Sequence, residues 1–346
     1  MRVSVTYDLR NPPQWRQPWQ QFYRDSIDHM VHMEALGYDA IWIQQHHFEE
    51  SAYGPSFAAL AGVLAARTRR VRVGSDIRML PLYHPLLVAE EMAFLDNLLD
   101  GRLDVGVGIG HRLLEFRVLG VNPKERPSRM DEGLQILRLA WTQERVTFHG
   151  KRFSLDNVEA QPKPVQTPHP PLWVGARTVP AAARAGRFRC HLLPGTSDPE
   201  VYRAYARALR EAGEDPGRYR VALGVSLIIT DEDPDKVWRR LRPYAIYRGR
   251  FYDEVAREMG DPPMQTAVMA AATETSDDDR YRPQYIIGAV GDVLRTLDRL
   301  RGGWSWDGVK VDELILRAPV AGLPLKDFAA TYERFARDIL PVVRKW

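Results

Sequence analysis

The sequence predicts an α/β protein, a (β/α)8 TIM barrel with insertions that occupies residues 1–346 as a single domain. Two observations lead to this prediction. Between Leu60 and Gly110, a strand, a proline-containing loop, an amphipathic helix and a second strand follow one another, as in a parallel strand–helix–strand unit. Strand-like and helix-like segments then alternate along most of the chain, and eight strand candidates suit this barrel.

Eight segments are predicted to form strands because β-branched and other apolar residues are concentrated in them. The third of them contains Val71, Val73 and Ile77, and it ends before Pro81 and Pro85 because proline cannot donate to a strand ladder. The predicted strands are residues 2–7, 39–44, 71–77, 103–110, 172–175, 191–193, 221–230 and 313–316.

Helices are predicted between these strands where apolar residues recur at spacings of three and four. In the helix after the third strand, Val88, Met92, Leu95 and Leu99 follow this spacing, so one face is expected to pack on a core. The predicted helices are residues 19–36, 56–67, 87–99, 129–141, 180–185, 199–211 and 328–343, with one more before the last strand.

Two stretches interrupt the alternation. Near residues 142–171 a small hairpin is predicted, followed by an extended segment, because five prolines lie between Gln161 and Leu172. Near residues 244–284 the sequence contains Asp261-Pro262-Pro263 and an acidic run. This second stretch is either a solvated connection or a lid over the barrel mouth.

Composition restricts the possible functions. The 48 basic and 45 acidic residues give a net charge of +3, which does not favour a nucleic-acid partner. Cys190 is the only cysteine, so neither an intrachain disulfide nor a cysteine-rich metal site is expected, and a reducing cytoplasm is suitable. No run of about 18 apolar residues occurs, and the chain enters its first strand directly. We therefore expect no membrane span and no targeting segment.

A pair of histidines, His46 and His47, follows the second predicted strand. Barrel enzymes carry their reacting groups at this end of the strands, and neutral imidazole can accept and return a proton. Both residues are therefore candidate catalytic groups, although they could instead satisfy buried polar groups. No metal site is predicted, because adjacent histidines cannot easily reach one zinc ion and no third ligand is evident from spacing.

A second candidate site is the turn Gly175-Ala176-Arg177-Thr178, which precedes the helix predicted from Pro180. Free amides at a helix start, a hydroxyl group and a guanidinium group together suit a phosphate. The alternative interpretation is ordinary helix capping.

The ordered set of motifs resembles the bacterial luciferase-like flavin-dependent monooxygenases, and the match covers nearly the whole chain. Any one of these motifs is weak evidence, but their order and spacing are specific. The motifs are Leu36 to Ile43 followed by His46-His47-Phe48, Arg70 to Gly74, Leu80-Pro81 with His84-Pro85, Ala89-Glu90-Glu91, Gly101 to Gly110, Arg129 to Gly133, Phe148 to Lys151, Pro162 to Gln166, His169 to Trp173 and Ile286-Ile287-Gly288.

This resemblance implies a cofactor site at the carboxyl ends of the strands. Ser75, Asp76 and Ile77 lie where the family often has a non-proline peptide, sometimes cis, against the flavin ring. Gly108 and Gly110, and the turn from Gly175 to Thr178 as the phosphate site, complete the implied set. Many relatives carry an arginine at the position of Ile109, so Arg112 or Arg177 is expected to replace it. Asp76 could alternatively do no more than turn the chain.

The resemblance also implies the chemistry. Reduced FMN is expected as a cosubstrate supplied by a separate flavin reductase, with molecular oxygen and a small or medium organic molecule as the other substrates. Related proteins use the deazaflavin F420 for hydride transfer, and others bind flavin without catalysis, so these alternatives stay open because fold does not separate them. A homodimer is expected through the helix 87–99, while Trp15, Trp19 and Tyr53 could wall the substrate side. His84 and His111 fall on the same face.

Overall fold

The computed structural model describes residues 1–259, 279–317 and 322–346, and a parallel ten-stranded sheet is its main element within these ranges. Strands rich in valine, isoleucine and leucine form it because both of its faces are buried. Its strands are β1 (Arg2–Tyr7), β2 (Ala40–Ile43), β3 (Arg72–Ser75), β4 (Arg78–Met79), β5 (Leu103–Gly108), β8 (Leu172–Ala176), β9 (His191–Pro194), β10 (Ala222–Ile229), β11 (Tyr285–Gly288) and β14 (Glu313–Arg317).

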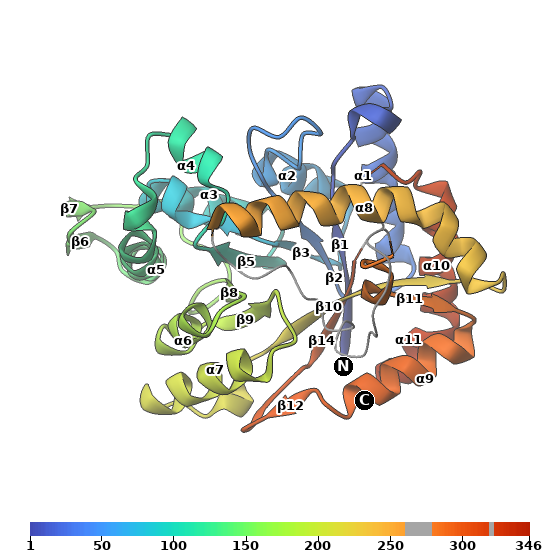
Figure 1. The fold of residues 1–346 in the computed structure, drawn as a ribbon. Coiled ribbons are helices and arrows are strands. Elements are labelled where there is room, and N and C mark those ends of the chain that lie inside the picture. Colours follow the sequence, from blue (N-terminus) through green and yellow to red (C-terminus); the bar gives the residue numbers. More distant parts are fainter. Residues whose placement is uncertain (260–278, 318–321) are drawn as a thin grey trace.

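The sheet is a curved half-barrel (Figure 1) with the strand order β11-β10-β14-β1-β2-β3-β5-β8-β9, and β4 pairs with β5. All eight predicted strands are present. The prediction that they close into a continuous ring is wrong for the described residues, because β9 approaches β10 through a single parallel bridge between Leu192 and Val221. The four residues of β9 are all paired with β8 along one edge, and among the described residues only Leu192 forms a bridge across its other edge. The architecture is therefore TIM-barrel-like.

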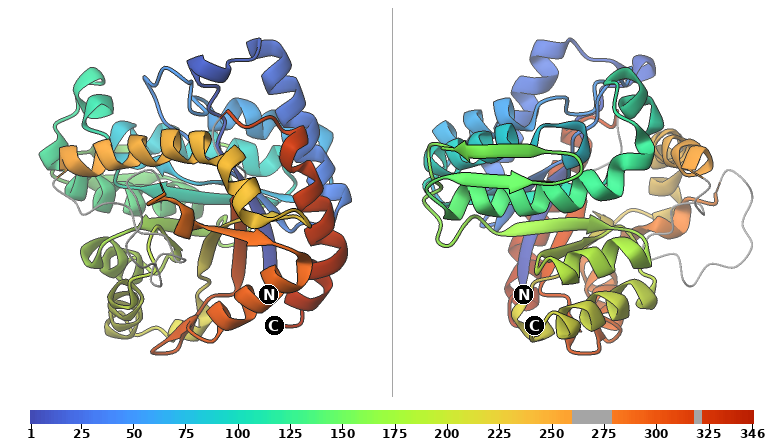
Figure 2. Two further views of the ribbon diagram at one scale, coloured as in Figure 1. Left: turned by 45° about the vertical axis from the view of Figure 1, so that its right-hand side comes forward. Right: turned by 90° about the vertical axis from the view of Figure 1, so that its left-hand side faces the viewer.

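Helices cover the outside of this sheet (Figure 2), and the two ends of the chain lie side by side. The Met1 amino group donates to the Arg344 carbonyl oxygen at 3.2 Å. The helices are α1 (Trp19–Ala35), α2 (Phe57–Arg67), α3 (Pro85–Leu98), α4 (Leu113–Val118), α5 (Arg126–Thr142), α6 (Val179–Arg187), α7 (Pro199–Glu211), α8 (Pro234–Met259), α9 (Val290–Arg301), α10 (Lys326–Arg334) and α11 (Leu340–Val343).

The helix boundaries follow local capping. α2 begins after Ser56, whose hydroxyl group accepts the amide of Ala59 at 3.3 Å. α3 begins two residues earlier than predicted, because the His84 side chain accepts the amide of Leu86 and Pro85 suits the first helical position. His84 is therefore a capping residue.

The predicted hairpin is formed by β6 (Val146–His149) and β7 (Ser154–Val158), which pair antiparallel. A second short hairpin consists of β12 (Ser305–Trp306) and β13 (Val309–Lys310). The loop of the first hairpin is fixed to α5 by the buried carboxylate of Glu132, which accepts the amides of Lys151, Arg152 and Phe153 at 2.8 to 3.0 Å.

The stretch predicted as a solvated connection or a lid, residues 244–284, begins within α8, which continues past the internal Pro243 to Met259. Its buried residues Leu241, Ala245, Arg248 and Ala256 recur at near-helical spacing, which explains why the helix persists. Residues 260–278, which include the acidic run up to Asp278, lie outside the described residues.

A buried polar cluster closes the amino-terminal end of the half-barrel. The carboxylates of Glu313 and Asp104 are inaccessible to solvent. Glu313 accepts the indole N–H of Trp42 at 2.9 Å, and Asp104 accepts that of Trp173 at 3.0 Å. Arg220 forms an ion pair with Asp104 at 3.1 Å. Because these groups fill the bottom of the half-barrel, the described residues leave the carboxyl ends of the strands as the end at which a ligand can enter.

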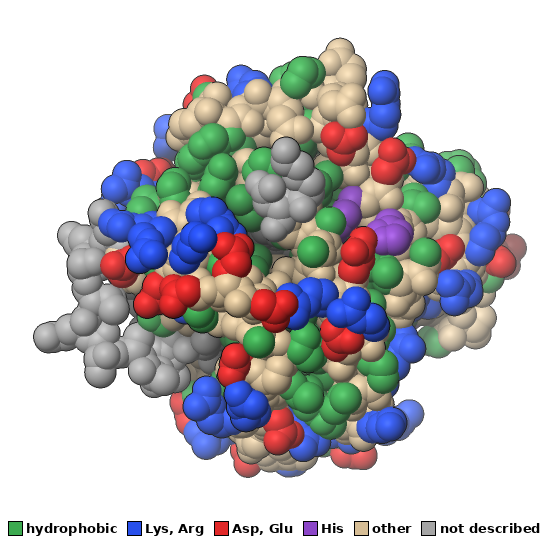
Figure 3. Space-filling view, turned by 90° about the vertical axis from the view of Figure 1, so that its right-hand side faces the viewer, with side chains coloured by type: hydrophobic (Ala, Val, Ile, Leu, Met, Phe, Trp, Pro, Cys, Tyr) green, Lys and Arg blue, Asp and Glu red, His purple; other side chains and the backbone are tan. Residues whose placement is uncertain are grey.

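The surface carries no extended patch of one charge on the face shown in Figure 3, where basic and acidic side chains are interspersed. Among the helices of the described residues, none is both long and apolar enough to cross a bilayer. The same residues contain no cluster of three or more histidine, cysteine, aspartate or glutamate side chains arranged to hold a metal ion.

Candidate functional site

A cavity of about 340 Å³ opens at the carboxyl ends of the strands. This volume lies within the range of sites for small molecules and cofactors. Segments that follow five strands of the sheet contribute to its wall, together with residues inside other strands and one face of α8. The lining residues include Thr6, Gln44, His46, Tyr53, Asp76, Ile77, Met79, Ile109, Gly110, His111, Arg126, Gly175, Ala176, Arg177, Thr178, Leu193, Gly195, Ala222, Gly224, Arg248, Tyr252, Ile315 and Arg317.

His46 faces this cavity and is held from behind by Glu115 of α4. Its Nδ1 lies 3.1 Å from the Oε1 atom of Glu115, whose side chain is 0% exposed. The same oxygen accepts the amide of His47 at 2.7 Å. Because a carboxylate can only accept, this contact places the proton of the neutral ring on Nδ1 and leaves Nε2 as the basic nitrogen.

His47 does not line the cavity. Its Nε2 lies 2.6 Å from the hydroxyl group of Tyr83, and burial lowers its pKa from the ordinary value of 6.5. The candidate catalytic pair is therefore divided by the structure: His46 reaches the cavity, and His47 contacts the protein on the other side of the loop. The chain bends at His47 and Phe48, where Phe48 has a φ of 54°, so the two histidine side chains diverge.

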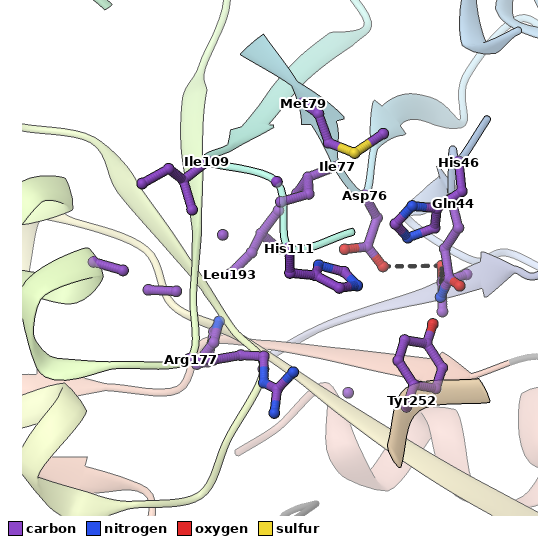
Figure 4. Close-up of a pocket in the computed structure, with 18 of the residues that line it drawn as sticks. Gln44, His46, Asp76, Ile77, Met79, Ile109, His111, Arg177, Leu193 and Tyr252 are labelled. Carbon is purple, nitrogen blue, oxygen red and sulfur yellow. Dashed lines mark hydrogen bonds between the residues drawn. The ribbon is translucent and has the colours of Figure 1, made fainter. Parts of the chain in front are cut away.

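His111 stands beside His46, with the ring centroids 5.1 Å apart (Figure 4). Burial lowers the pKa of His111 well below 6.5, and the electrostatic effects of its neighbours, His46 first, act in the same direction. Its Nε2 is buried without a hydrogen-bond partner in the described part of the chain. A neutral, unpartnered ring nitrogen at a cavity wall is available to a ligand.

Asp76 and Ile77 line the cavity from the turn after β3, and the peptide between them is cis, as the family resemblance led us to expect. The Thr6 hydroxyl group donates to Asp76 at 3.2 Å, and burial raises the pKa of this carboxyl group. Ser75 does not line the cavity. Its hydroxyl group donates to the Gly106 carbonyl oxygen at 2.7 Å and so links β3 to β5.

Two glycines make room for the Ile77 side chain. A Cβ atom at Gly108 would lie 1.9 Å from the Ile77 Cδ1 atom, and one at Gly175 would lie 2.5 Å from it. Gly108 therefore acts beneath the cavity and does not line it, whereas Gly110 and Gly175 do. The glycine-rich end of β5 thus lets the sheet accept a branched side chain and keep the cavity floor flat.

The turn from Gly175 to Thr178 lines the cavity as predicted, and α6 begins directly after it. Thr178 occupies the N-cap position but makes no side-chain capping hydrogen bond, so the first amides of α6 and the hydroxyl group remain available. The Arg177 guanidinium extends into the cavity (Figure 4), and Gly195 leaves space for its side chain. These groups have the chemistry of an anion site.

Arg112 does not supply a charge to the cavity. Its guanidinium group donates to the carbonyl oxygens of His47 and Phe48, the latter at 3.0 Å, and it lies outside the cavity lining. Of the two arginines expected to replace the one missing at Ile109, the structure therefore places only Arg177 at the cavity. Ile109 itself contributes an apolar surface there.

Several lining residues were not predicted from the sequence. Arg126 begins α5, Arg248 and Tyr252 belong to α8, and Arg317 ends β14. Glu115, the partner of His46, was also missed. The alternation of β14 would have pointed to Arg317, since it lies two residues after the inward-facing Ile315. Trp15 and Trp19 do not line the cavity: Trp15 packs on Tyr244 at 4.3 Å and Trp19 on Tyr23 at 5.7 Å, whereas Tyr53 does line it.

The residues present fit a phosphorylated flavin or deazaflavin. Four arginines face the cavity against the one carboxyl group of Asp76, so the cavity favours anions. An apolar wall of Ile77, Met79 and Ile109 suits a flat ring system. The unpartnered His111 Nε2 offers a hydrogen bond to a polar ring atom.

Comparison with models of known protein families identifies the family of this chain. The family model described as luciferase-like monooxygenase matches residues 1–303. The chain belongs to the luciferase-like monooxygenase family. The resemblance found in the sequence motifs is thereby confirmed.

Members of this family that resemble the chain have two kinds of cofactor in their names. The oxygenase component of the flavin-dependent trigonelline monooxygenase of Acinetobacter baylyi is 23% identical over 94% of this chain and 91% of its own length. The F420-dependent glucose-6-phosphate dehydrogenase of Intrasporangium calvum is 32% identical over 95% of this chain and 98% of its own. The crystal structure of the monooxygenase RslO1 from Streptomyces bottropensis matches with a TM-score of 0.78 and 24% identity, covering 99% of each chain. Family membership thus leaves the choice between flavin and F420 open.

Proposed function

We propose that this protein is a flavin-dependent monooxygenase that uses reduced FMN and molecular oxygen to oxygenate a small or medium organic molecule. One observation carries the proposal. The basic nitrogen of His46 and the anion-binding turn of Arg177 and Thr178 come from distant parts of the chain and face one cavity. A flavin bound there would have its phosphate at α6 and its ring beside a histidine, and it would supply the electrons that reduce oxygen.

The chain's own residues have distinct roles in this proposal. Arg177, Thr178 and the first amides of α6 would bind the phosphate. Ile77 would contact the ring system, and His111 Nε2 would offer it a hydrogen bond. His46 takes a proton from the substrate or returns one at Nε2, and Glu115 keeps its ring oriented and its Nδ1 protonated.

A second candidate is an F420-dependent oxidoreductase that transfers hydride without oxygen. The relative from Intrasporangium calvum favours it, since it is 32% identical over nearly the whole chain. The same anion-binding turn would accept the phosphate of either cofactor, so cofactor choice is a question for measurement.

The proposal is tested by titrating the purified protein with reduced FMN and with reduced F420, and by following oxygen consumption with candidate substrates. We expect saturable binding of reduced FMN and substrate-dependent oxygen uptake. Binding of F420 with anaerobic turnover, and no reaction with reduced FMN in air, would decide for the second candidate. Binding of neither cofactor would contradict both.

Two partners follow from the proposal. A separate flavin reductase would supply the reduced FMN, as the name of the Acinetobacter relative, an oxygenase component, suggests for that protein. We also propose a homodimer through the outer face of α3, where Leu87, Phe94 and Leu98 are 65%, 53% and 47% exposed and share one side of the helix. Light scattering of the wild type and of Phe94→Glu tests the dimer, which the charged side chain should dissociate.

A further inference from the structure

We propose that the cavity contains a second anion site, formed by Arg317 and Arg248, and that it binds the carboxylate of an organic acid. This proposal rests on the proposed function, because it assigns the chemical class of the substrate at the same cavity. The second site does not include the anion-binding turn from Gly175 to Thr178 at the start of α6.

Arg317 is placed at the cavity by the pleat of β14. It lies two residues after Ile315, so both side chains point to the inside of the half-barrel, and both line the cavity. Gly224 on the neighbouring β10 leaves the required space, since a Cβ atom there would lie 2.4 Å from the Arg317 Nε atom. The Arg317 guanidinium group therefore occupies the space at the cavity wall that a side chain at position 224 would fill.

Arg317 lacks a fixed partner in the part of the chain that the structure describes. Its backbone lies in the ladders with β1 and β10, but its guanidinium group makes no hydrogen bond and no ion pair with any described residue. Burial and the nearby Arg248 lower its pKa, while Asp76 acts in the opposite direction. Two guanidinium groups that line one cavity repel each other, and an anion bound between them would remove this repulsion.

Arg248 comes from α8, which crosses the mouth of the half-barrel (Figure 1). Its side chain hydrogen-bonds Tyr285, and its guanidinium carbon lies 5.6 Å from the ring centre of Tyr252, one helical turn further on. It has no ion pair with a described carboxylate. The nearby Asp8 already forms an ion pair with Arg10, so it is not available to Arg248.

The charge of the site favours a carboxylate. Two guanidinium groups against the carboxyl group of Asp76 leave about one positive charge, which matches a monoanion better than a phosphate. Apolar atoms of Ile315, Ala222 and Leu193 lie beside the site and suit a hydrocarbon body. Guanidinium groups also match the planar, two-oxygen geometry of a carboxylate.

The site is separate from the phosphate turn. Arg177 follows β8 and Arg317 ends β14, and β9 and β10 lie between these strands. At about 4.8 Å per strand, the two positions are roughly 14 Å apart along the sheet. One cavity can thus hold the cofactor phosphate and a substrate carboxylate at different places.

The test compares two acids with their uncharged amides: benzoate with benzamide, and 4-phenylbutyrate with 4-phenylbutyramide. Calorimetric titration of the full chain, with and without FMN, measures each affinity. We expect at least one acid to bind tenfold or more tightly than its amide. Equal affinity of acid and amide in both pairs, or no binding of either acid at millimolar concentration, would overturn the proposal.

Variants test which arginine binds the carboxylate of the acid. Arg317→Gln and Arg248→Gln should each abolish the preference for the acid and leave FMN affinity within about twofold, while Arg177→Gln should do the reverse. Arg317→Lys keeps the charge and should retain part of the preference for the acid. This variant replaces Arg317→Gln in the test if the glutamine variant does not fold. Loss of the preference in Arg177→Gln alone would contradict the assignment. Acid binding without FMN binding would contradict only the proposed function.

Discussion

At the scale of single residues, the site depends on contacts that fix which atom faces the ligand. Glu115 is buried and does not reach the cavity. Its carboxylate accepts hydrogen bonds from the His46 ring and from the His47 amide, and so it orients the imidazole. Ile77 depends in the same way on the missing side chains of Gly108 and Gly175. The positions of His46 and Ile77 at the cavity thus depend on residues that lie behind them.

Replacement of His46 by alanine should lower turnover by about 10² to 10⁴-fold, the usual contribution of a general acid or base, with FMN affinity changed by less than about threefold. Steady-state oxygen uptake and a flavin titration on the same sample measure the two effects. Unchanged turnover would remove the acid–base role of His46.

Glu115→Gln tests the orienting role. The amide keeps the shape but no longer favours a proton on Nδ1, so we expect a smaller fall in turnover, of about 10 to 100-fold, and a shifted pH–rate profile. An identical profile in wild type and variant would show that Glu115 is only structural.

Gly108→Ala should destabilise the fold by about 1–3 kcal/mol, because the new methyl group would overlap the Ile77 side chain. Gly62→Ala is the matched control: nothing lies within 4 Å of its Cβ position in α2, and alanine should stabilise that helix by about 0.5–1 kcal/mol. Urea denaturation of both variants measures these changes, and equal effects would contradict the clash.

At the scale of elements, three units bring chemistry to one cavity: the short helix α4, the start of α6 and the long helix α8. α4 carries Glu115, α6 presents its amino end and α8 contributes Arg248 and Tyr252. Each unit lies near the carboxyl ends of the strands, which is where parallel half-barrels leave side chains free for ligands.

The start of α6 can be separated from the neighbouring loop by two arginine variants. Arg177→Gln should weaken FMN binding by about tenfold or more and leave riboflavin binding unchanged, since only FMN carries the phosphate. Arg112→Gln should affect both flavins equally, because Arg112 binds loop carbonyl groups. Fluorescence titrations with both flavins decide, and an FMN-specific defect in Arg112→Gln would reverse the assignment.

At the scale of the whole molecule, buried charges close the amino-terminal end of the half-barrel. Asp104 is paired with arginines, and after the opposing cost of burial these charges hold its pKa below the ordinary 3.8. Asp312 lies at the same end, and there burial dominates and raises its pKa to about 6. The two carboxyl groups should therefore change stability with pH in opposite directions.

Asp312→Asn should make the protein more stable at neutral pH, by roughly 1–2 kcal/mol. In the wild type, the raised pKa gives stability that is complete below pH 3.8 and is lost as the pH rises through about 6. The uncharged variant should lack this loss and still accept the Val221 amide. Unfolding free energies between pH 4 and 7 measure the difference.

Asp104→Asn is the control with the opposite sign. Its lowered pKa gives stability above pH 3.8 that is lost as the pH falls further, so the variant should be less stable at neutral pH and converge with the wild type in acid. Parallel curves for the two variants would contradict both assignments.

The sequence by itself determined the order of strands and helices, the hairpin, the family and the segments that meet at the carboxyl ends of the strands. These features depend on local periodicity, on proline and glycine, and on motifs that are contiguous in the chain. His46 and the turn from Gly175 to Thr178 were found in this way at the ends of predicted strands, whereas Asp76 was implied by the family resemblance. The continuation of α8 past Pro243, by contrast, was not predicted.

Only the tertiary structure decided which of the candidate side chains share the cavity. It separated His46 from His47, assigned Arg112 to a loop, and joined Glu115, Arg248 and Arg317 to the site. It also showed a half-barrel edge joined by one bridge instead of a closed ladder. The physical reason is that side-chain direction and strand closure depend on partners far away in the chain, and a pattern of neighbouring residues does not contain those partners.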